Sequence, residues 1–152
     1  MIKRFFILLI CAGLSACAQL TEYSVGLDNK RLSDCPASPR CVSSAEHLAE
    51  KRARAFYLVT PITANWQNVI AVVSRQDRTL IAKHEANYLH AEVTSPWGWY
   101  TDDLELLLDA DSGRIDVRSS GRIGYYDFDV NRDRIESLRL TLASEGLIKP
   151  TH

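Results

Sequence analysis

Arginine and carboxylate side chains are concentrated in and around residues 118–136, where they could bind an anion or pair with one another. A planar guanidinium donates two parallel hydrogen bonds to a carboxylate or phosphate, so unpaired arginines here would form an anion clamp. If the acidic side chains take these hydrogen bonds instead, the stretch is an ion-pair network. The sequence leaves both interpretations open. The arginines are Arg118, Arg122, Arg132, Arg134 and Arg139, and the acids are Asp102, Asp103 and Glu105.

Aromatic residues lie close to these charges in the sequence and could line a groove for the lipid or glycan part of a ligand. They are Trp97, Trp99, Tyr125 and Tyr126. We also expect a helix with Asn131 as its N-cap, which would bring free backbone N–H groups to the same place. The candidate ligand-binding residues are therefore Arg118, Arg122, Arg132, Arg134, Asp102, Asp103, Trp99 and Tyr125.

A calcium loop is a weaker interpretation of the acidic residues that follow. Asp127, Asp129, Asn131 and Asp133 alternate as at the start of an EF-hand loop. The sixth position of that loop should be glycine and the twelfth glutamate, and here arginine and leucine stand there. We therefore expect no metal site.

A hydrolase or a zinc site would need histidine, and the histidines are poorly placed for either. Ser95, His90 and Asp102 are a convenient catalytic trio, but their spacing is not diagnostic and no G-x-S-x-G motif is present. Zinc would draw on His84 and His90, which we expect on opposite faces of one hairpin.

The N-terminus has the pattern of a secretory signal. Two basic residues precede the apolar run 5–14, which is too short to span a bilayer comfortably. Residues 14–17 read L-S-A-C and resemble a bacterial lipobox, so we expect cleavage before Cys17 and acylation of its thiol. An ordinary cleaved signal and a short uncleaved anchor are the alternatives. Ala18 follows where sorted lipoproteins can carry aspartate, and this resemblance favours the outer membrane, facing the periplasm.

Cysteine usage fits that compartment. Cys11 is lost with the signal and Cys17 takes the lipid, which leaves Cys35 and Cys41. An even pair in an oxidising compartment favours a disulfide, and the proline-rich turn 36–40 would hold the two sulfurs close. We expect no cofactor. The nearly balanced charge, 18 basic against 19 acidic residues, provides no footprint for nucleic acid.

Two motifs resemble a family catalogued as domain of unknown function 1499. Residues 118–136 resemble its pattern R-S-x-S-R-x-G-x-S-D-x-G-x-N-R-x-R-x-E, and residues 35–44 resemble its C-P-x-S-P-N-C-V-S-S. The resemblance extends from Cys35 to about Leu142. Departures from the pattern make a hydroxyl-lined anion site poorer and more acidic here. They are Gly121, Tyr126 and Asp129.

Hydrophobic periodicity and turn residues predict two hairpins. Residues 79–85 and 88–94 should pair around a two-residue turn, with Leu80 opposite Val93 and His84 opposite Leu89. Residues 104–109 and 114–119 should pair around the loop 110–113, which places Glu105 opposite Arg118. A further strand is expected near residues 55–61.

Two helices are expected to cover this sheet. The first bears Trp66, Val69, Ile70 and Val73 on one face. The second begins near residue 131 and bears Ile135, Leu138 and Leu142, with Gly146 as its stop signal.

We therefore expect an α+β fold in which an antiparallel sheet of four to five strands packs against two helices. Residues 1–16 would be the signal, 17–33 a membrane tether and 34–149 a single domain. The expected function is that of a non-enzymatic envelope lipoprotein, held at the membrane by its acyl anchor. It would bind an anionic small molecule, a lipid or an envelope protein through its arginine and aromatic surface. An envelope hydrolase is the alternative.

Overall fold

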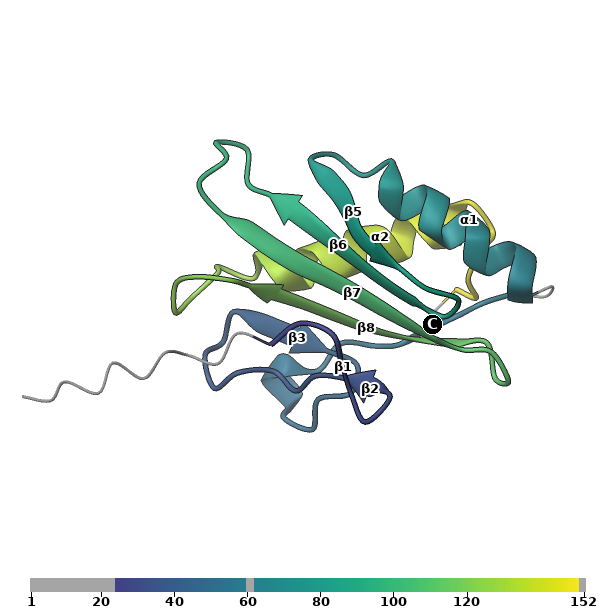
Figure 1. Ribbon diagram of the computed structural model, residues 1–152, viewed down its shortest axis with the longest axis horizontal. Helices are drawn as coiled ribbons and strands as arrows, with labels where there is room; N and C mark the ends of the chain where they lie inside the picture. The colour runs from purple at the N-terminus through teal and green to yellow at the C-terminus, as the bar shows by residue number, and fades with distance from the viewer. Residues whose placement is uncertain (1–23, 60–61, 151–152) are drawn as a thin grey trace, which may run out of the picture.

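An antiparallel sheet forms the centre of the protein in the computed structural model, which describes residues 24–59 and 62–150 (Figure 1). Five strands follow in the order β3-β8-β7-β6-β5, and β4 pairs with β8 as a sixth, one more than expected. The additional strand is β3, which comes from the disulfide segment. The strands are β3 (Cys41–Ser43), β4 (Phe56–Tyr57), β5 (Thr79–His84), β6 (Tyr88–Thr94), β7 (Thr101–Asp109) and β8 (Arg114–Gly121).

The β7–β8 hairpin has the register that its loop predicts. Glu105 lies opposite Arg118, and Asp109 lies opposite Arg114. Side chains alternate along a strand, so one face of β7 carries leucines and the other carries acids. Leu104 and Leu106 lie in the core, whereas Asp103 and Glu105 are buried on the opposite face.

The β5–β6 hairpin follows the expected register only near its turn. His84 lies opposite Leu89 as expected, but Thr79, rather than Leu80, lies opposite Val93. The register shifts between Ile81 and Lys83, so the strand contains a bulge. The bulge turns Ile81 toward the core and leaves Leu80 65% exposed, which corrects the expected face of β5.

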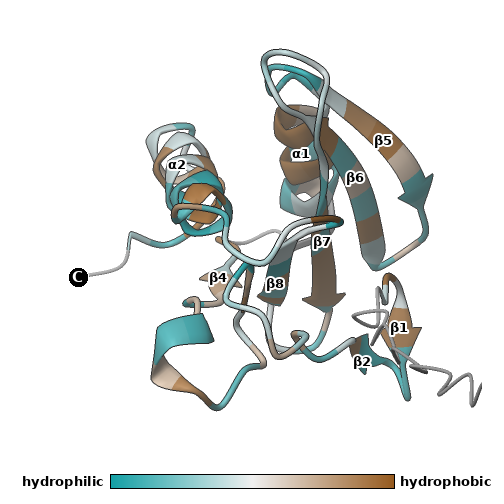
Figure 2. Ribbon diagram, turned by 90° about the vertical axis from the view of Figure 1, so that its left-hand side faces the viewer, coloured by the Kyte–Doolittle hydropathy of each residue, from teal (hydrophilic) through white to brown (hydrophobic). Residues whose placement is uncertain are grey.

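Two helices cover the leucine face, as expected. Helix α1 (Ile62–Ser74) buries Trp66, Val69 and Val73. Helix α2 (Val130–Ser144) buries a stripe of three residues, and Gly146 ends it with a φ of 71°. Figure 2 shows both helices on one side of β7 and β8. The α2 stripe is Ile135, Leu138 and Leu142.

The expected N-cap of α2 is wrong. Asn131 is fully buried inside the first turn, and Asp129, with a φ of 63°, holds the cap position. The Asp127 carboxylate accepts hydrogen bonds from the backbone N–H and the side-chain amide of Asn131, at 3.1 and 2.8 Å. A side chain of the protein therefore already satisfies a helix N–H that was expected to face a ligand.

The chain before residue 34 is folded against the sheet where the structure describes it. Strands β1 (Leu27–Asp28) and β2 (Arg31–Leu32) form a hairpin, and the Gly26 N–H donates to a Glu105 carboxylate oxygen at 2.8 Å. Residues 26–33, which fall in the expected tether 17–33, therefore contact the sheet. The hairpin lies on the acidic face of β7, away from the helices (Figure 2).

The expected signal and the acylation site Cys17 lie outside the described residues. Within residues 24–59 and 62–150, neither helix has the length and apolar character needed to cross a membrane.

Candidate functional site

The disulfide between Cys35 and Cys41 is confirmed, and it ties down one side of the charged stretch. Its Cα atoms lie 5.6 Å apart, and Cys41 begins β3, which pairs with β8. Several hydrogen bonds join the loop inside the disulfide to the rest of the domain. Lys51 Nζ donates to the Pro36 carbonyl at 2.6 Å, and the Asn131 amide donates to the Arg40 carbonyl at 3.0 Å. The disulfide loop therefore braces the start of α2.

Arg118 is part of a buried network on the acidic face of the sheet. Its Nη1 lies 2.7 Å from Glu105 Oε2, and both side chains are almost fully buried. The other Glu105 oxygen accepts hydrogen bonds from the Tyr88 hydroxyl at 2.6 Å and from the Gly26 N–H. Burial, together with the hydrogen bond to Glu105, raises the pKa of Tyr88 well above its ordinary value of 10.0. Arg118 is thus committed to the interior.

Arg122 joins two strands through their carboxylates. Its guanidinium contacts Asp103 at 2.8 Å and also pairs with Glu92 of β6. His90 Nε2 lies 2.7 Å from the same Asp103 carboxylate, which is fully buried. Arg122 therefore neutralises Glu92 and Asp103, which the β6–β7 pairing brings together.

His90, Glu92 and Asp103 together have the donor atoms of a metal site. One ligand atom from each of His90, Glu92 and Asp103 lies within 4.8 Å of the others. Imidazole with two carboxylates suits a divalent transition metal. Arg122 already contacts both carboxylates, so a metal ion would have to displace its guanidinium. The geometry therefore favours the ion-pair network over a metal site.

Arg134 links α2 to the sheet. It lies 2.7 Å from Asp102 and donates to the side-chain oxygens of Ser119 and Asn131, at 2.9 and 2.5 Å. Arg132 points elsewhere and donates to the backbone carbonyls of residues 50 and 52. These arginines connect elements that are distant in the sequence.

The four candidate arginines thus all have partners inside the protein. An anion clamp needs guanidinium groups that are open to the ligand. Here the guanidinium groups pair with carboxylates of β6 and β7, or donate hydrogen bonds to α2 and to the segment 50–52. Of the two interpretations left open by the sequence, the structure favours the ion-pair network for these residues.

The trio Ser95, His90 and Asp102, weighed from the sequence as a hydrolase site, is not assembled. His90 contacts Asp103 rather than Asp102, and Asp102 pairs with Arg134. The Ser95 hydroxyl accepts a hydrogen bond from the Tyr100 N–H. Each of the three side chains therefore has a different partner, and the serine is not held by the histidine.

An apolar groove of about 700 Å³ opens at the end of the sheet where the charged stretch begins. We call it the aromatic groove. The α1–β5 loop, the β6–β7 loop, the β8–α2 loop and one side of α2 line it, together with the Asp102–Arg134 pair. Its apolar lining includes Val93, Tyr100, Leu104, Ile123, Tyr126, Phe128, Val130 and Leu138.

Of the four aromatic residues that were expected to line a groove, one lines this groove. Tyr126 lines it, whereas Trp97, Trp99 and Tyr125 stand exposed on the same two loops without lining it. Tyr100 and Phe128 line the groove and were missed. Their position in the same two aromatic-rich loops was the available signal.

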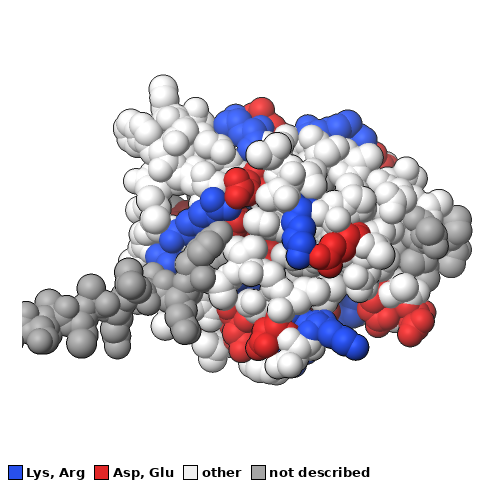
Figure 3. Space-filling view, viewed as in Figure 1, with Lys and Arg blue, Asp and Glu red and all other residues white. Residues whose placement is uncertain are grey.

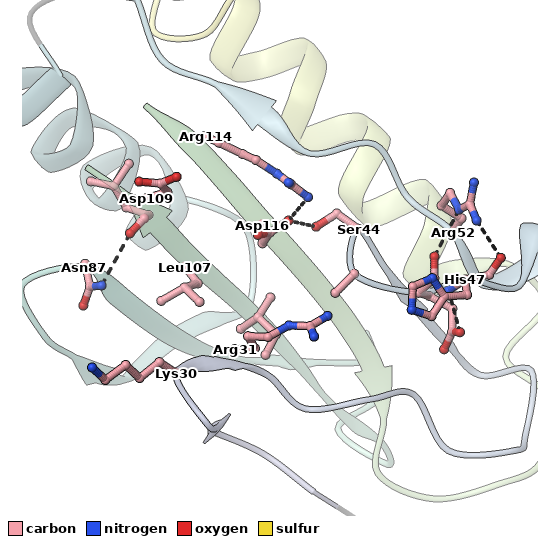
Figure 4. Close-up of a pocket in the computed structure, with 14 residues that line it drawn as sticks. Lys30, Arg31, Ser44, His47, Arg52, Asn87, Leu107, Asp109, Arg114 and Asp116 are labelled. Atoms are coloured by element: carbon pink, nitrogen blue, oxygen red, sulfur yellow. Dashed lines mark hydrogen bonds and ion pairs between the residues drawn. The ribbon is translucent and has the colours of Figure 1, made fainter. Parts of the chain in front are cut away.

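A second hollow, of about 730 Å³, lies on the opposite face beside the β1–β2 hairpin (Figure 4). Asp116 there accepts a hydrogen bond from Ser44 at 2.6 Å and pairs with Arg114 at 2.7 Å. Hydrogen bonds from the Ser112 hydroxyl and from backbone N–H groups lower the pKa of Asp109, which also borders the hollow. The carboxylates of Asp109 and Asp116 therefore already have hydrogen-bond or ion-pair partners within the protein. This hollow was not predicted from the sequence.

Comparison with known proteins identifies a family for the chain. No curated protein and no solved structure matches it. A family model described as "Protein of unknown function (DUF1499)" matches residues 31–142, which include the disulfide, the sheet and most of α2. The match begins inside the β1–β2 hairpin, in agreement with a domain that starts before residue 34. The chain therefore belongs to the DUF1499 family of proteins of unknown function.

Proposed function

We propose that the protein is a non-enzymatic lipoprotein of the cell envelope, which binds the acyl chain of an amphiphile in the aromatic groove. The observation that carries the proposal is the groove itself. Its volume of about 700 Å³ falls within the range of about 300–1,000 Å³ that is usual for small-molecule sites. Most of its lining is apolar, which suits a hydrocarbon chain better than a phosphate or a sugar.

The exposure of the lining supports the same choice. Ile123, Phe128 and Val130 keep large fractions of their side chains in contact with water. A contiguous apolar patch of this kind on a folded domain usually marks a binding site. A ligand chain would remove these side chains from water, at about 25 cal/mol per Å² of apolar surface.

The half-buried Asp102–Arg134 pair provides a polar point for the ligand's headgroup. Both side chains are 17% exposed, and both line the groove. The pair is neutral as a whole, so we propose that the headgroup is held by hydrogen bonds rather than by net charge. This differs from the anion clamp considered from the sequence.

The cellular part of the proposal rests on the sequence alone. The lipobox-like residues 14–17 support acylation at Cys17, and Ala18 supports the outer membrane. In such a location a lipid-binding groove would have its ligand at hand. The hydrolase alternative has no support from the trio Ser95, His90 and Asp102, which have separate partners.

Binding of a fluorescent fatty acid, 11-(dansylamino)undecanoic acid, to the purified full chain tests the proposal. We expect saturable binding to wild type and binding at least about tenfold weaker in Val130→Asp, a loss of about 1.4 kcal/mol. Val130 lines the groove at the first position of α2, where an aspartate is compatible with the helix dipole.

Leu140→Asp is the matched control. Leu140 is also an exposed apolar residue of α2, but it does not line the groove. We expect its affinity for the probe to stay within about twofold of wild type. Equal affinities for all three proteins, or no saturable binding to wild type, would refute the groove as a lipid site.

A further inference from the structure

The two loops at the groove carry six exposed aromatic side chains, which we call the aromatic tip. We propose that the aromatic tip docks into the interface of a zwitterionic lipid bilayer. This inference deepens the proposed function, since it rests on the acyl anchor at Cys17. The tip residues, with their exposed fractions, are Trp97 (80%), Trp99 (75%), Tyr100 (52%), Tyr125 (73%), Tyr126 (55%) and Phe128 (81%).

Strand pairing brings the two loops to one end of the molecule. Asp102 lies opposite Gly121, so the β6–β7 loop and the β8–α2 loop continue from neighbouring strand ends. The Arg122 N–H donates to the Thr101 carbonyl at the point where the loops begin. Figure 1 shows both loops projecting at the same end, and Figure 2 looks onto that end. The six aromatic side chains therefore lie at one end of the molecule.

A defined turn holds the tryptophans out. The Gly98 N–H donates to the Ser95 carbonyl at 2.9 Å, and the Tyr100 carbonyl accepts from the Ser95 N–H at 2.9 Å. Gly98 has a φ of 72°, which glycine adopts without strain. The indole groups on either side of it are thus presented to the surroundings by a hydrogen-bonded loop rather than buried in the fold.

The residue types fit a bilayer interface. Tryptophan and tyrosine have an apolar ring and a polar N–H or O–H, and they concentrate where lipid headgroups meet hydrocarbon. Figure 3 shows that the protruding β6–β7 loop presents no lysine, arginine, aspartate or glutamate on the face in view. The β6–β7 part of the tip can therefore enter the interface without bringing charged groups into it.

The length of chain before the domain allows this contact. The seven residue steps from Cys17 to Ser24 span at most about 25 Å. Gly26 is bonded to Glu105, and the four steps of β7 from Glu105 to Thr101, where the tip begins, cover about 13 Å. An acyl anchor at Cys17 can therefore keep the aromatic tip within reach of the bilayer surface.

The charges next to the tip select the kind of bilayer. The β8–α2 loop also carries Asp127 and Asp129, and Asp133 follows in the first turn of α2. Acidic groups here would oppose an anionic surface. A zwitterionic surface is compatible with them, and docking then depends on the aromatic rings rather than on net charge.

Quenching of tryptophan fluorescence by brominated lipid tests the proposal in the acylated full chain. The protein has three tryptophans, and Trp66 is buried in the core, so it serves as an internal control. The chain is reconstituted into phosphatidylcholine vesicles, with or without bromine at carbons 6 and 7 of one acyl chain. We expect Trp66→Phe, which keeps Trp97 and Trp99, to lose at least about half of its emission in brominated vesicles.

The double variant Trp97→Phe/Trp99→Phe, which keeps only Trp66, should show equal emission in the two kinds of vesicle. If Trp66→Phe and wild type each showed the same emission in brominated and in unbrominated vesicles, the proposal would be overturned. A protein would then be the better candidate for the partner of the tip. Quenching that disappears in about 1 M salt would also overturn the proposal, because charge would then hold the tip. The double variant should still bind the dansyl probe, since neither tryptophan lines the groove. Failure of docking and failure of ligand binding are thus separate results.

Discussion

Glu105 and Arg118 face each other across the β7–β8 hairpin, with 2.7 Å between Oε2 and Nη1 and almost no exposed surface on either side chain. Burying such a pair costs desolvation free energy, and substituting only one of its two residues costs more stability than replacing both. Each half would leave a charge in the interior without its partner. The pair is therefore the first target for mutation.

Arg118→Ala should lower the free energy of unfolding by about 3–5 kcal/mol, because it leaves the Glu105 carboxylate buried and unpaired. The double variant Glu105→Gln/Arg118→Met should regain a large part of that loss. Urea unfolding of the single and double variants measures both effects. Arg75→Ala, which breaks the exposed pair with Glu145, should cost under about 1 kcal/mol. A loss of that size at Arg118 would contradict a structural role.

Stability should fall in alkaline solution because of Tyr88. Its pKa is raised in the folded state by burial and by the hydrogen bond to Glu105, so above pH 10 the unfolded chain loses this proton and the folded protein keeps it. The stabilising contribution is complete below pH 10 and declines above it, by about 1.4 kcal/mol per pH unit. Tyr88→Phe should lack this part of the decline. Parallel alkaline unfolding curves for both proteins would contradict the prediction.

Loss of the disulfide should destabilise the domain by about 2 kcal/mol, from the closure entropy of a loop that spans six positions. The variant Cys35→Ser/Cys41→Ser should melt earlier than wild type without reductant, and reduced wild type should approach it. Thermal melts with and without dithiothreitol provide the measurement. Two free thiols in protein recovered after export would show that the bond does not form in the cell.

Asn131 should tolerate no change, because it joins three segments. Its amide donates to the Arg40 carbonyl and to Asp127, and its oxygen accepts from Ser119 and Arg134. Asn131→Ala removes these four hydrogen bonds together, although some of the groups keep a second partner, and we expect a loss of about 1–3 kcal/mol. Asn131→Asp should be as harmful, since a second carboxylate would then face Asp127. Thermal melts of both variants should show losses well above that of Ser144→Ala at the exposed end of α2.

Acylation is expected at Cys17. Cys17→Ser should abolish incorporation of radiolabelled palmitate and shift the protein out of the membrane fraction, because multiple acyl chains hold a protein at a bilayer without a spanning helix. Labelling of the Cys17→Ser protein at the wild-type level would rule out this site.

The local parts of the fold could be predicted from the sequence, and the non-local parts could not. Loop 110–113 fixed the β7–β8 register, including Glu105 opposite Arg118, because a short loop restricts the pairing. The bulge in β5 left no equivalent mark, since Leu80 and Ile81 are both apolar and either could face the core. The pairing of β3 with β8 joins residues distant in the chain, and nothing in residues 41–43 specifies that partner.

The candidate site divides in the same way. Asp102 and Arg134 do lie at the groove, whereas Asp103 and Arg118 are buried on the other face of the sheet. The sequence showed that the charges were complementary, but which arginine meets which acid depends on the sheet register and on the direction of α2. The β1–β2 hairpin was missed because its strands are only two residues long, too short for any periodicity.

The bulge in β5 also bears on the solubility of the protein. β5 is the last strand in the sheet order, so its outer edge offers unpaired backbone groups to any neighbouring strand. The bulge bends that edge, and the Lys83–Glu85 ion pair places charge beside it, which together disfavour strand addition by a second copy. In the anchored state proposed above, copies of the protein would meet at high local concentration. An irregular, charged edge strand would then disfavour a sheet shared between two copies.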